Sequence, residues 1–354
     1  MKVATILGAR PQFIKAAAVS RELRKQADEV LVHTGQHYDG NMSQVFFDEL
    51  DIPPPKYNLG IGSGGHGAQT GAMLAAIEEV LLKEKPDRVL VYGDTNSTLA
   101  GALAAAKLHV PVAHVEAGLR SFNRRMPEEI NRVLTDHVSD LLFCPSETAV
   151  ANLAAEGIRA GVHRVGDVMR EALMHAVAVA RRRSDVLERL GVRAGGYALA
   201  TIHRAENTDD PARLERLVSA LQEVSLHLPV IFPVHPRTRG KLHLPKASGD
   251  LRLLEPQGYL DMVLLEAGAA VILTDSGGIQ KEAYWLRIPC VTLRNETEWV
   301  ETVQQGWNVL AGAEPDLIVR AARNIRRPPD GLDAYQGAGS VERLVQVLQG
   351  ARTA

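Results

Sequence analysis

The sequence predicts an α/β protein made of two doubly wound halves. Short β-rich runs alternate with longer helical patterns almost from one end to the other, and the alternation restarts near the middle of the chain. Several of these short runs are apolar throughout, which is typical of strands buried on both faces of a parallel sheet. Two such halves facing each other would form an interdomain cleft, because ligands of open α/β sheets bind at the carboxyl ends of strands.

In the first half, five predicted strands alternate with five predicted helices. The strands are residues 3–7, 30–33, 88–92, 112–115 and 141–144. The helices are residues 12–26, 67–84, 97–108, 128–138 and 147–156. Pro11 and Pro127 stand at two of these helix starts, where the missing amide hydrogen of proline costs nothing.

The second half repeats the pattern after a link near residues 165–168 and an arginine-rich helix that contains residues 181–183. The predicted strands are residues 197–202, 230–234, 251–254, 271–274 and 290–293, and the helices are residues 210–226, 259–267 and 279–286. A stretch rich in proline and glycine, residues 327–339, precedes a final helix at residues 340–348. We therefore expect domains at residues 1–168 and 169–335 and a terminal segment at residues 336–354.

The composition is that of a soluble globular protein, with no bias toward nucleic acids or membranes. The 354 residues are 45% hydrophobic and 23% charged, and their formal net charge is −2. No apolar run could span a bilayer, and the apolar N-terminal run fits a strand better than a signal peptide, so we expect a cytoplasmic protein. Cys144 and Cys290 lie beside apolar runs, which predicts two buried, reduced thiols and no zinc site.

The turn after the first predicted strand, residues 8–15, is a candidate anion site. A strand end that leads into a helix offers exposed amides and a favourable dipole to an anion, and Arg10 and Lys15 add two cations. The segment lacks the glycines of a dinucleotide fingerprint and the Gly-Lys-Ser/Thr of a P-loop. The alternative is that Arg10 and Lys15 are ordinary surface charges.

Two acidic residues follow neighbouring predicted strands. Asp94 comes after residues 88–92, and Glu116 comes after residues 112–115. Carboxylates at neighbouring strand ends should converge, and their proximity would raise the pKa of one of them, which makes it a candidate acid or base. The alternatives are that Asp94 caps the next helix and that Glu116 pairs with Arg120.

A third acidic residue, Glu128, begins the helix at residues 128–138. Glu128 and Arg132 stand at an i,i+4 spacing, which predicts an ion pair on one face of the helix. We expect the buried face to hold Ile130, Val133, Leu134, His137 and Val138. The pair is either surface decoration of small energetic value or a carboxylate held at the cleft.

In the second half, His203 and Arg204 follow the first strand, at the place that residues 8–15 occupy in the first half. Cationic groups there could stabilise a leaving diphosphate, whereas a lone histidine is more often structural.

Ser276, Gly277 and Gly278 follow the strand at residues 271–274 and begin a helix. Glycines at such a start let backbone amides approach a phosphate closely. Glu282 lies one helical turn further on, where its carboxylate could accept both hydroxyl groups of a ribose.

Together these motifs resemble the non-hydrolysing UDP-N-acetylglucosamine 2-epimerase family. The resemblance is carried, in order, by residues 8–15, 33–37, 92–95, 114–120, 127–132, 201–204 and 273–282. It implies a GT-B-like fold of two Rossmann-like domains, with the final helix crossing back to the first domain. It also implies that UDP binds mainly to the second domain, that the sugar lies in the cleft, and that the protein is a homodimer.

The resemblance also implies a role for individual residues. The residues implied in catalysis are Asp94, Glu116, Glu128 and His203. Those implied in substrate binding are Arg10, Lys15 and Arg132, and those implied in nucleotide binding are Gln257, Ser276, Gly277, Gly278 and Glu282.

The sequence departs from the family pattern at four places. They are Met262 for an aromatic residue, Trp299 for an arginine, Ala205 for the second arginine of His-Arg-Arg-Glu, and a loop at residues 121–126 that is two residues short. This combination resembles the branch that acts on UDP-2,3-diacetamido-2,3-dideoxyglucuronic acid, which is the alternative to UDP-N-acetylglucosamine as substrate.

The implied reaction is inversion at C2 of a UDP-linked amino sugar. No carbonyl acidifies the C2 proton, so UDP would leave first, C1 would become oxocarbenium-like, and a 2-acetamidoglucal would form before UDP returns. The basic residues and the glycine-rich amides suit the diphosphate, and the three carboxylates suit the proton. No hydride moves, so we expect neither a cofactor nor a metal. The alternatives are a glycosyltransferase of the same fold and a non-catalytic UDP-sugar sensor.

Overall fold

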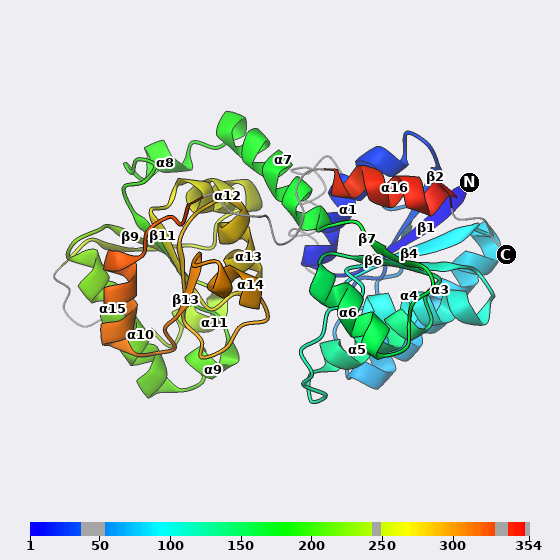
Figure 1. The fold of residues 1–354 in the computed structure, drawn as a ribbon, viewed down its shortest axis with the longest axis horizontal. Coiled ribbons are helices and arrows are strands. Elements are labelled where there is room, and N and C mark those ends of the chain that lie inside the picture. The colour runs from blue at the N-terminus through cyan, green and yellow to red at the C-terminus, as the bar shows by residue number, and fades with distance from the viewer. Residues whose placement is uncertain (37–53, 243–248, 330–338, 351–354) are drawn as a thin grey trace. The chain divides into compact units, whose positions relative to one another are not determined.

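The computed structural model describes residues 1–36, 54–242, 249–329 and 339–350. The chain divides into two compact units, Met1–Ala172 with Asp333–Ala354, and Leu173–Leu332 (Figure 1). The divisions expected from the sequence, after residues 168 and 335, differ from these by a few residues. His37 of the family motif and most of the stretch at residues 327–339 lie outside the described residues.

In its described part, the first unit is built on a parallel sheet of seven strands in the order β3-β2-β1-β4-β5-β6-β7. The strands are β1 Lys2–Leu7, β2 Asp28–His33, β3 Tyr57–Asn58, β4 Arg88–Tyr92, β5 Val112–Val115, β6 Leu141–Cys144 and β7 Val162–Arg164. The strand order reverses between β1 and β4, and ligands of doubly wound sheets bind at such a reversal. The segments that carry Lys15, Asp94 and Glu116 follow β1, β4 and β5.

The second unit has a parallel sheet of six strands within its described residues, in the order β10-β9-β8-β11-β12-β13. The strands are β8 Ala198–Thr201, β9 Val230–Pro233, β10 Leu251–Leu254, β11 Val271–Thr274, β12 Cys290–Thr292 and β13 Asn308–Leu310. The order reverses between β8 and β11. His203 follows β8 and Ser276 follows β11, so both stand at this reversal.

Helices connect the strands of each sheet. Those of the first unit are α1 Arg10–Leu23, α3 His66–Glu84, α4 Asn96–Lys107, α5 Pro127–His137, α6 Glu147–Ala155 and α16 Ser340–Gly350. α7 Val168–Arg183 leads into the second unit, which holds α8 Val186–Arg189, α9 Ala205–Thr208, α10 Pro211–Ser225, α11 Pro236–Arg239, α12 Tyr259–Gly268, α13 Gly277–Trp285, α14 Val300–Gln304 and α15 Pro315–Asn324.

Both faces of the second sheet are buried, as the unbroken apolar runs predict. Ala198 and Ala200 of β8 pack in one core with Leu217 of α10, whereas Leu199 packs in another core with Leu265 of α12. Successive residues of a strand point to opposite faces, so these two cores lie on opposite sides of the sheet.

Three strands are missing from the sequence-based prediction: β3, β7 and β13. All three are edge strands of only two or three residues, and most of their residues are half-buried or exposed. An edge strand needs less apolar surface than a central one, so its sequence lacks the run that marks the others. The prediction also lacks α15, which starts at Pro315 and buries Ile318 and Val319.

The buried face predicted for α5 is wrong. Ile130 and Leu134 are 46% and 47% exposed, and His137 is exposed as well. The buried residues of this helix are polar, namely Glu129, Asn131, Thr135 and Asp136. Tertiary hydrogen bonds and ion pairs to neighbouring segments, described below, turn the polar face inward and override the apolar periodicity.

The chain ends in the first unit. α16 lies against α1, as the red and blue helices of Figure 1 show. Arg343 donates to the carbonyl of Val165 through Nη2 at 2.6 Å and Nε at 3.0 Å, and the amide of Val341 donates to Glu171 at 3.1 Å. These contacts attach the final helix to the start of α7.

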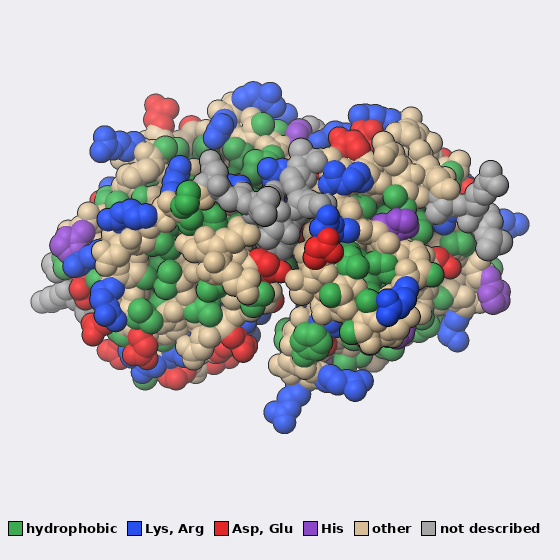
Figure 2. All heavy atoms as spheres, in the orientation of Figure 1, with side chains coloured by type: hydrophobic (Ala, Val, Ile, Leu, Met, Phe, Trp, Pro, Cys, Tyr) green, Lys and Arg blue, Asp and Glu red, His purple; other side chains and the backbone are tan. Residues whose placement is uncertain are grey.

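Cys144 and Cys290 are buried and not joined in a disulfide, as predicted. Burial raises the pKa of each thiol to about 12, so both are protonated at neutral pH. Among the described residues, no helix is both long and apolar enough to cross a membrane. On the face shown in Figure 2, acidic and basic side chains of the described residues are interspersed.

Candidate functional site

Gln12 joins the start of α1 to the end of β4. Its Oε1 accepts hydrogen bonds from the amides of Gly8 at 2.8 Å and Ala9 at 2.9 Å, and its Nε2 donates to the carbonyl of Tyr92 at 2.8 Å. The prediction that these amides are exposed to an anion is therefore wrong for Gly8 and Ala9, because a side chain of the protein binds them.

Lys15 and Glu116 form a buried ion pair at this edge of the sheet. Lys15 Nζ contacts Glu116 Oε2, and the two side chains are 9% and 12% exposed. Burial is the largest single effect on the pKa of Lys15 and lowers it, but the charge and hydrogen bond of Glu116 outweigh burial, so the pKa is raised. Lys15 is thus no ordinary surface charge. The side chain of Arg10 lies outside the described part of the structure.

Glu116 adopts a left-handed backbone conformation, with a φ of 74°. Such a conformation is uncommon outside glycine and costs on the order of 1–3 kcal/mol. The amides of Glu116 and Ala117 both donate to the carbonyl of Phe143, at 3.1 and 3.2 Å, and so help to hold the turn. The strained turn presents the Glu116 carboxylate to Lys15.

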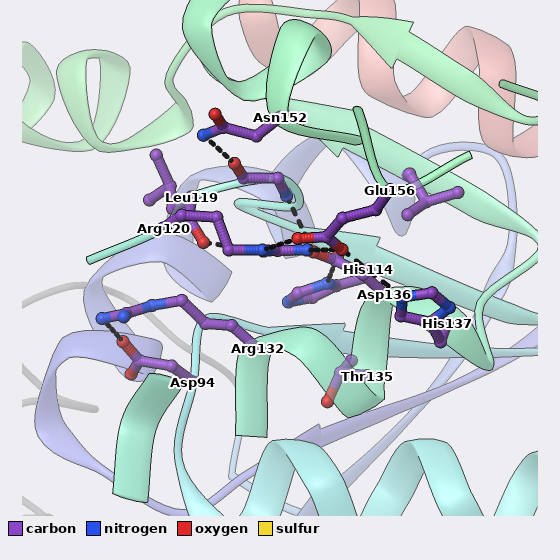
Figure 3. A network of polar contacts seen from close by, with 12 residues as sticks. Asp94, His114, Leu119, Arg120, Arg132, Thr135, Asp136, His137, Asn152 and Glu156 are labelled. Carbon is purple, nitrogen blue, oxygen red and sulfur yellow. Dashed lines mark hydrogen bonds and ion pairs between the residues drawn. The ribbon is translucent and has the colours of Figure 1, made fainter. Parts of the chain in front are cut away.

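Asp94 is held by a cation from α5. Arg132 Nη2 lies 2.6 Å from Asp94 Oδ2 (Figure 3). Asp94 does not cap the next helix, because the hydroxyl of Thr95 accepts the capping hydrogen bond of α4. Asp94 and Glu116 therefore each have a separate cation.

The predicted pair of Glu128 and Arg132 is wrong. Arg132 Nη1 lies 2.8 Å from Glu129 Oε2 instead. Glu129 is 3% exposed and accepts hydrogen bonds at 2.9 Å from the amides of Ser121 and Phe122, which attach the preceding loop to α5. Glu128 is exposed in the first turn of α5, where its carboxylate is accessible.

Figure 3 also shows a charge cluster of His114, Arg120, Asp136 and Glu156, in which the first three side chains are buried and Glu156 is 27% exposed. Asp136 contacts His114 Nδ1 and Arg120 Nη1, both at 2.7 Å. Arg120 also donates to Glu156 through Nε at 2.7 Å and Nη2 at 2.8 Å, so it does not pair with Glu116. Sequence reasoning missed Asp136, which directly precedes His137, because the wrong face of α5 was assigned to the core.

In the second unit, His203 is oriented by Asp275. His203 Nδ1 lies 3.0 Å from Asp275 Oδ1, and the amides of His203 and Arg204 both donate to this carboxylate. Asn207 Nδ2 donates to Asp275 as well, at 3.0 Å. Burial is the largest single effect on the pKa of Asp275 and raises it, but His203 and the other donors outweigh burial and lower the pKa.

The His203 side chain is 37% exposed, so its ring is held at one nitrogen and still reaches solvent. The His235 ring lies 5.7 Å from it between centroids. The site residues predicted from the sequence include His203 but not Asp275. Asp275 lies in the motif at residues 273–282 and could have been found by its place at a strand end.

Ser276 is the N-cap of α13, and its hydroxyl accepts from the amide of Ile279. A Cβ at Gly277 would lie 3.2 Å from Glu298 Oε1 and 3.4 Å from Trp299 Nε1. The segment that carries Trp299 therefore packs against the predicted phosphate-binding turn, and only glycine fits there without displacement.

Trp299 stands where the family pattern has an arginine. Lys281 Nζ lies 4.0 Å from the centroid of the Trp299 ring and 5.1 Å from that of Trp285, in a cation–π arrangement. Lys281 is 4% exposed, so its charge is enclosed by these rings.

The other two predicted nucleotide contacts lie elsewhere on the second unit. Glu282 is 9% exposed in α13. Gln257 is half-buried before α12, and its Nε2 donates to the carbonyl of Glu255 at 2.7 Å.

Each unit thus gathers its own set of predicted residues. The first unit brings together Lys15, Asp94, Glu116 and Arg132, and the second brings His203 and the start of α13 to one buried Asp275. Among the described residues, no three or more His, Cys, Asp and Glu side chains are grouped as a metal site would require.

Comparison with known proteins places this arrangement in a family. The sequence model of the family described as UDP-N-acetylglucosamine 2-epimerase matches residues 21–349. A UDP-N-acetylglucosamine 2-epimerase homolog from Methanococcus maripaludis is 55% identical over 99% of both chains. A UDP-2,3-diacetamido-2,3-dideoxy-D-glucuronate 2-epimerase from Pseudomonas aeruginosa is 53% identical over 98% of this chain and 99% of its own.

Solved structures agree with the sequence relatives. The UDP-GlcNAc 2-epimerase of Methanocaldococcus jannaschii, in complex with UDP-GlcNAc and UDP, is 46% identical and superposes with a TM-score of 0.87 over 99% of this chain and all of that one. The enzyme of Neisseria meningitidis bound to UDP-GlcNAc is 30% identical, with a TM-score of 0.88 over 99% of this chain and all of that one. The fold is accordingly GT-B-like. The chain belongs to the UDP-N-acetylglucosamine 2-epimerase family and is an enzyme of the isomerase class.

Proposed function

We propose that this enzyme is a non-hydrolysing UDP-sugar 2-epimerase that interconverts UDP-N-acetylglucosamine and UDP-N-acetylmannosamine. UDP is eliminated to leave a 2-acetamidoglucal and is then added back, and the product serves surface polysaccharide synthesis. The observation that carries the proposal is the pair of carboxylates at one sheet edge, each with its own cation: Glu116 with Lys15 and Asp94 with Arg132.

This pairing suits acid–base work at C2. In the elimination the C1–O bond breaks with its electrons going to UDP, and a carboxylate takes the C2 proton. In the following addition step, C2 is protonated on the opposite face while UDP adds to C1. Asp94, Glu116 and the accessible Glu128 are the proposed acids and bases, and such positioned catalysis contributes about 10²–10⁴-fold. The ion pairs keep Asp94 and Glu116 in place for both directions.

The diphosphate must be stabilised each time it leaves. Arg10, Lys15 and Arg132 are the proposed substrate contacts of the first unit. In the second unit, His203 is held by Asp275 and can face a phosphate with its other nitrogen. The proposed nucleotide contacts are Gln257, Ser276, Gly277, Gly278 and Glu282. Preorganised donors of this kind usually stabilise the transition state more than any other single effect does.

UDP-2,3-diacetamido-2,3-dideoxyglucuronic acid is the second candidate substrate. The 53% identity to an enzyme named for that sugar favours it, and so does Trp299, which stands beside Gly277 in place of an arginine. A comparison of kcat/KM for the two UDP-sugars decides between them.

Turnover in D₂O tests the reaction type. An epimerase incubated with UDP-sugar alone yields the C2 isomer with deuterium at C2, because the proton is exchanged with solvent. A glycosyltransferase would require an acceptor, a hydrolase would release free sugar, and a sensor would bind UDP-sugar without exchange. Product that carries no solvent deuterium would exclude elimination.

We further propose that the enzyme is a cytoplasmic homodimer, as members of this family typically are. Its measured mass in sedimentation equilibrium tests the assembly, with twice the chain mass expected.

A further inference from the structure

His114 stands at one end of the charge cluster in the first unit, where it contacts Asp136. It lies on β5, its side chain is fully buried, and both of its ring nitrogens have an oxygen neighbour. Nδ1 lies 2.7 Å from Asp136 Oδ1, and Nε2 lies 2.8 Å from the carbonyl oxygen of Gly93.

Both neighbours of the imidazole are acceptors. A carbonyl oxygen accepts only, and the Asp136 carboxylate also accepts from the amide of Gly118 at 3.0 Å and from Arg120 at 2.7 Å. Burial is the largest single effect on the pKa of Asp136 and raises it, but the charges and hydrogen bonds of His114 and Arg120 lower it overall. Asp136 is therefore ionised. A neutral imidazole has one N–H and would turn a lone pair toward one of these oxygens.

We propose that His114 is a buried imidazolium that donates from both ring nitrogens, and that it is a positioning residue for Asp94 and Glu116. The charges around it balance: Arg120 and His114 face Asp136 and Glu156, and His137 contacts Glu156 from the outer side at 3.4 Å. Buried charges persist when they are paired and hydrogen-bonded in this way.

The hydrogen bond from Nε2 fixes the backbone beside the Lys15–Glu116 pair. A Cβ at Gly93 would lie 3.4 Å from Glu116 Oε2 and 3.5 Å from Lys15 Nζ, so the Gly93 backbone borders both charged groups. Asn131 Nδ2 donates to the next carbonyl, that of Asp94, at 2.9 Å. Two consecutive carbonyls are thus held by two side chains, which sets the direction of the Asp94 carboxylate.

The hydrogen bond from Nδ1 fixes the turn that carries Glu116. Asp136 binds the amide of Gly118 with Oδ2 while Oδ1 faces His114, so one carboxylate spans the strained residue. A left-handed Glu116 persists only where its surroundings over-determine it. Asp136 also lies on the same helix as Arg132, the partner of Asp94.

Two substitutions separate the two hydrogen bonds of His114. In His114→Gln the amide nitrogen reaches the place of Nε2 and can still donate to Gly93, whereas in His114→Asn it reaches the place of Nδ1 and can donate only to Asp136. We expect H114Q to keep kcat within about 10-fold of wild type and H114N to lose about 100-fold, since a misplacement of about 1 Å costs about that factor. KM should change less than kcat in both variants.

The role of His114 rests on the proposed epimerase activity, whereas its protonation state does not. His163→Asn, on β7 of the same sheet, is the matched control and should leave kcat unchanged. Urea unfolding measures the stability of each variant. If H114Q and H114N lost the same fraction of kcat, and this loss paralleled their loss of unfolding free energy, the positioning role would be overturned.

Nitrogen-15 NMR of the histidine rings tests the imidazolium independently of any reaction. The His114 signals, identified by their absence from H114Q, should show protons on both ring nitrogens in the folded protein at neutral pH, because both nitrogens face acceptor oxygens. A ring nitrogen of His114 without a proton under these conditions would overturn the imidazolium. Wild-type protein that is inactive on both UDP-sugars but shows two ring protons would refute the proposed function alone.

Discussion

Lys15 Nζ and Glu116 Oε2 form an ion pair between α1 and the end of β5, with both side chains about nine-tenths buried. A buried pair contributes little compared with an apolar replacement, but removal of one partner leaves an uncompensated charge. This asymmetry makes the pair a sensitive test of the site.

We expect Lys15→Met to destabilise the protein by about 3–5 kcal/mol, because Glu116 loses its cation inside the first unit. Urea unfolding measures this change, and Lys25→Met is the control, since Lys25 is 62% exposed and its pair is worth about 0–1 kcal/mol. The double variant Lys15→Met/Glu116→Gln should lose less unfolding free energy than the two single variants lose in sum. Additive effects would show that the two groups do not interact.

The same pair predicts a dependence of stability on alkaline pH. The folded pKa of Lys15 is raised above its ordinary value of 10.5, so the pair contributes its full stability below that value. The contribution is lost as pH rises through the folded pKa. As pH rises from neutral through the folded pKa of Lys15, wild type should lose more unfolding free energy than Lys15→Met. Equal losses in the two proteins would contradict this expectation.

Glu128 and Glu129 are adjacent on α5, but their substitution should affect different properties of the enzyme. Glu128→Gln should lower kcat by about 100-fold or more, as expected for a general acid or base, with UDP affinity and stability retained. Glu129→Gln should lower stability instead, because Glu129 is buried and binds Ser121, Phe122 and Arg132. Calorimetric UDP titration and steady-state kinetics separate the outcomes, and a fully active Glu128→Gln enzyme would assign Glu128 a structural role.

Glu116→Gln should also lose most of kcat while UDP binding is retained. The neutral amide cannot take the C2 proton and no longer balances Lys15. Deuterium exchange at C2 should fall together with kcat, and wild-type exchange would remove Glu116 from the proton transfer.

Asp275→Asn should impair both the stability and the activity that depend on His203. Asparagine would turn an NH₂ group toward donors, and an unsatisfied buried group costs about 1–3 kcal/mol. The folded pKa of Asp275 is below the ordinary 3.8, so its contribution is present above that value and lost as pH falls through the folded pKa. The unfolding free energies of wild type and Asp275→Asn should therefore converge at low pH. Asp209→Asn, which removes a surface pair with Lys241, is the control.

Gly278→Ala should weaken UDP binding without loss of stability. The closest protein atom that an added Cβ would meet, Ser276 Oγ, is 3.8 Å away, so an effect on affinity reports the ligand. We expect a rise in Kd of about 10-fold, equal to about 1.4 kcal/mol, by calorimetry. Gly71→Ala, which places a Cβ in open space inside α3, should leave the Kd for UDP unchanged and raise stability by about 0.5–1 kcal/mol. Unchanged affinity in Gly278→Ala would place the phosphates elsewhere.

The central strands and the identity of the residues that follow them can be predicted from local patterns. A central strand must be apolar on both faces, so β1, β4 and β8 are legible in the sequence, whereas the edge strands β3, β7 and β13 are not. Lys15, Asp94, Glu116 and His203 could be named because each follows such a strand within a recognisable motif.

The sequence by itself determined the fold class, the family and the set of acidic and basic residues at the strand ends, because apolar periodicity and motif order are local properties of the chain. Only the tertiary structure decided the partner of each charge. Arg132 binds Asp94 and Glu129 instead of Glu128, and Arg120 binds Asp136 and Glu156 instead of Glu116. Charge pairing depends on which segments meet in space and which groups are desolvated there, and no spacing along the chain encodes that.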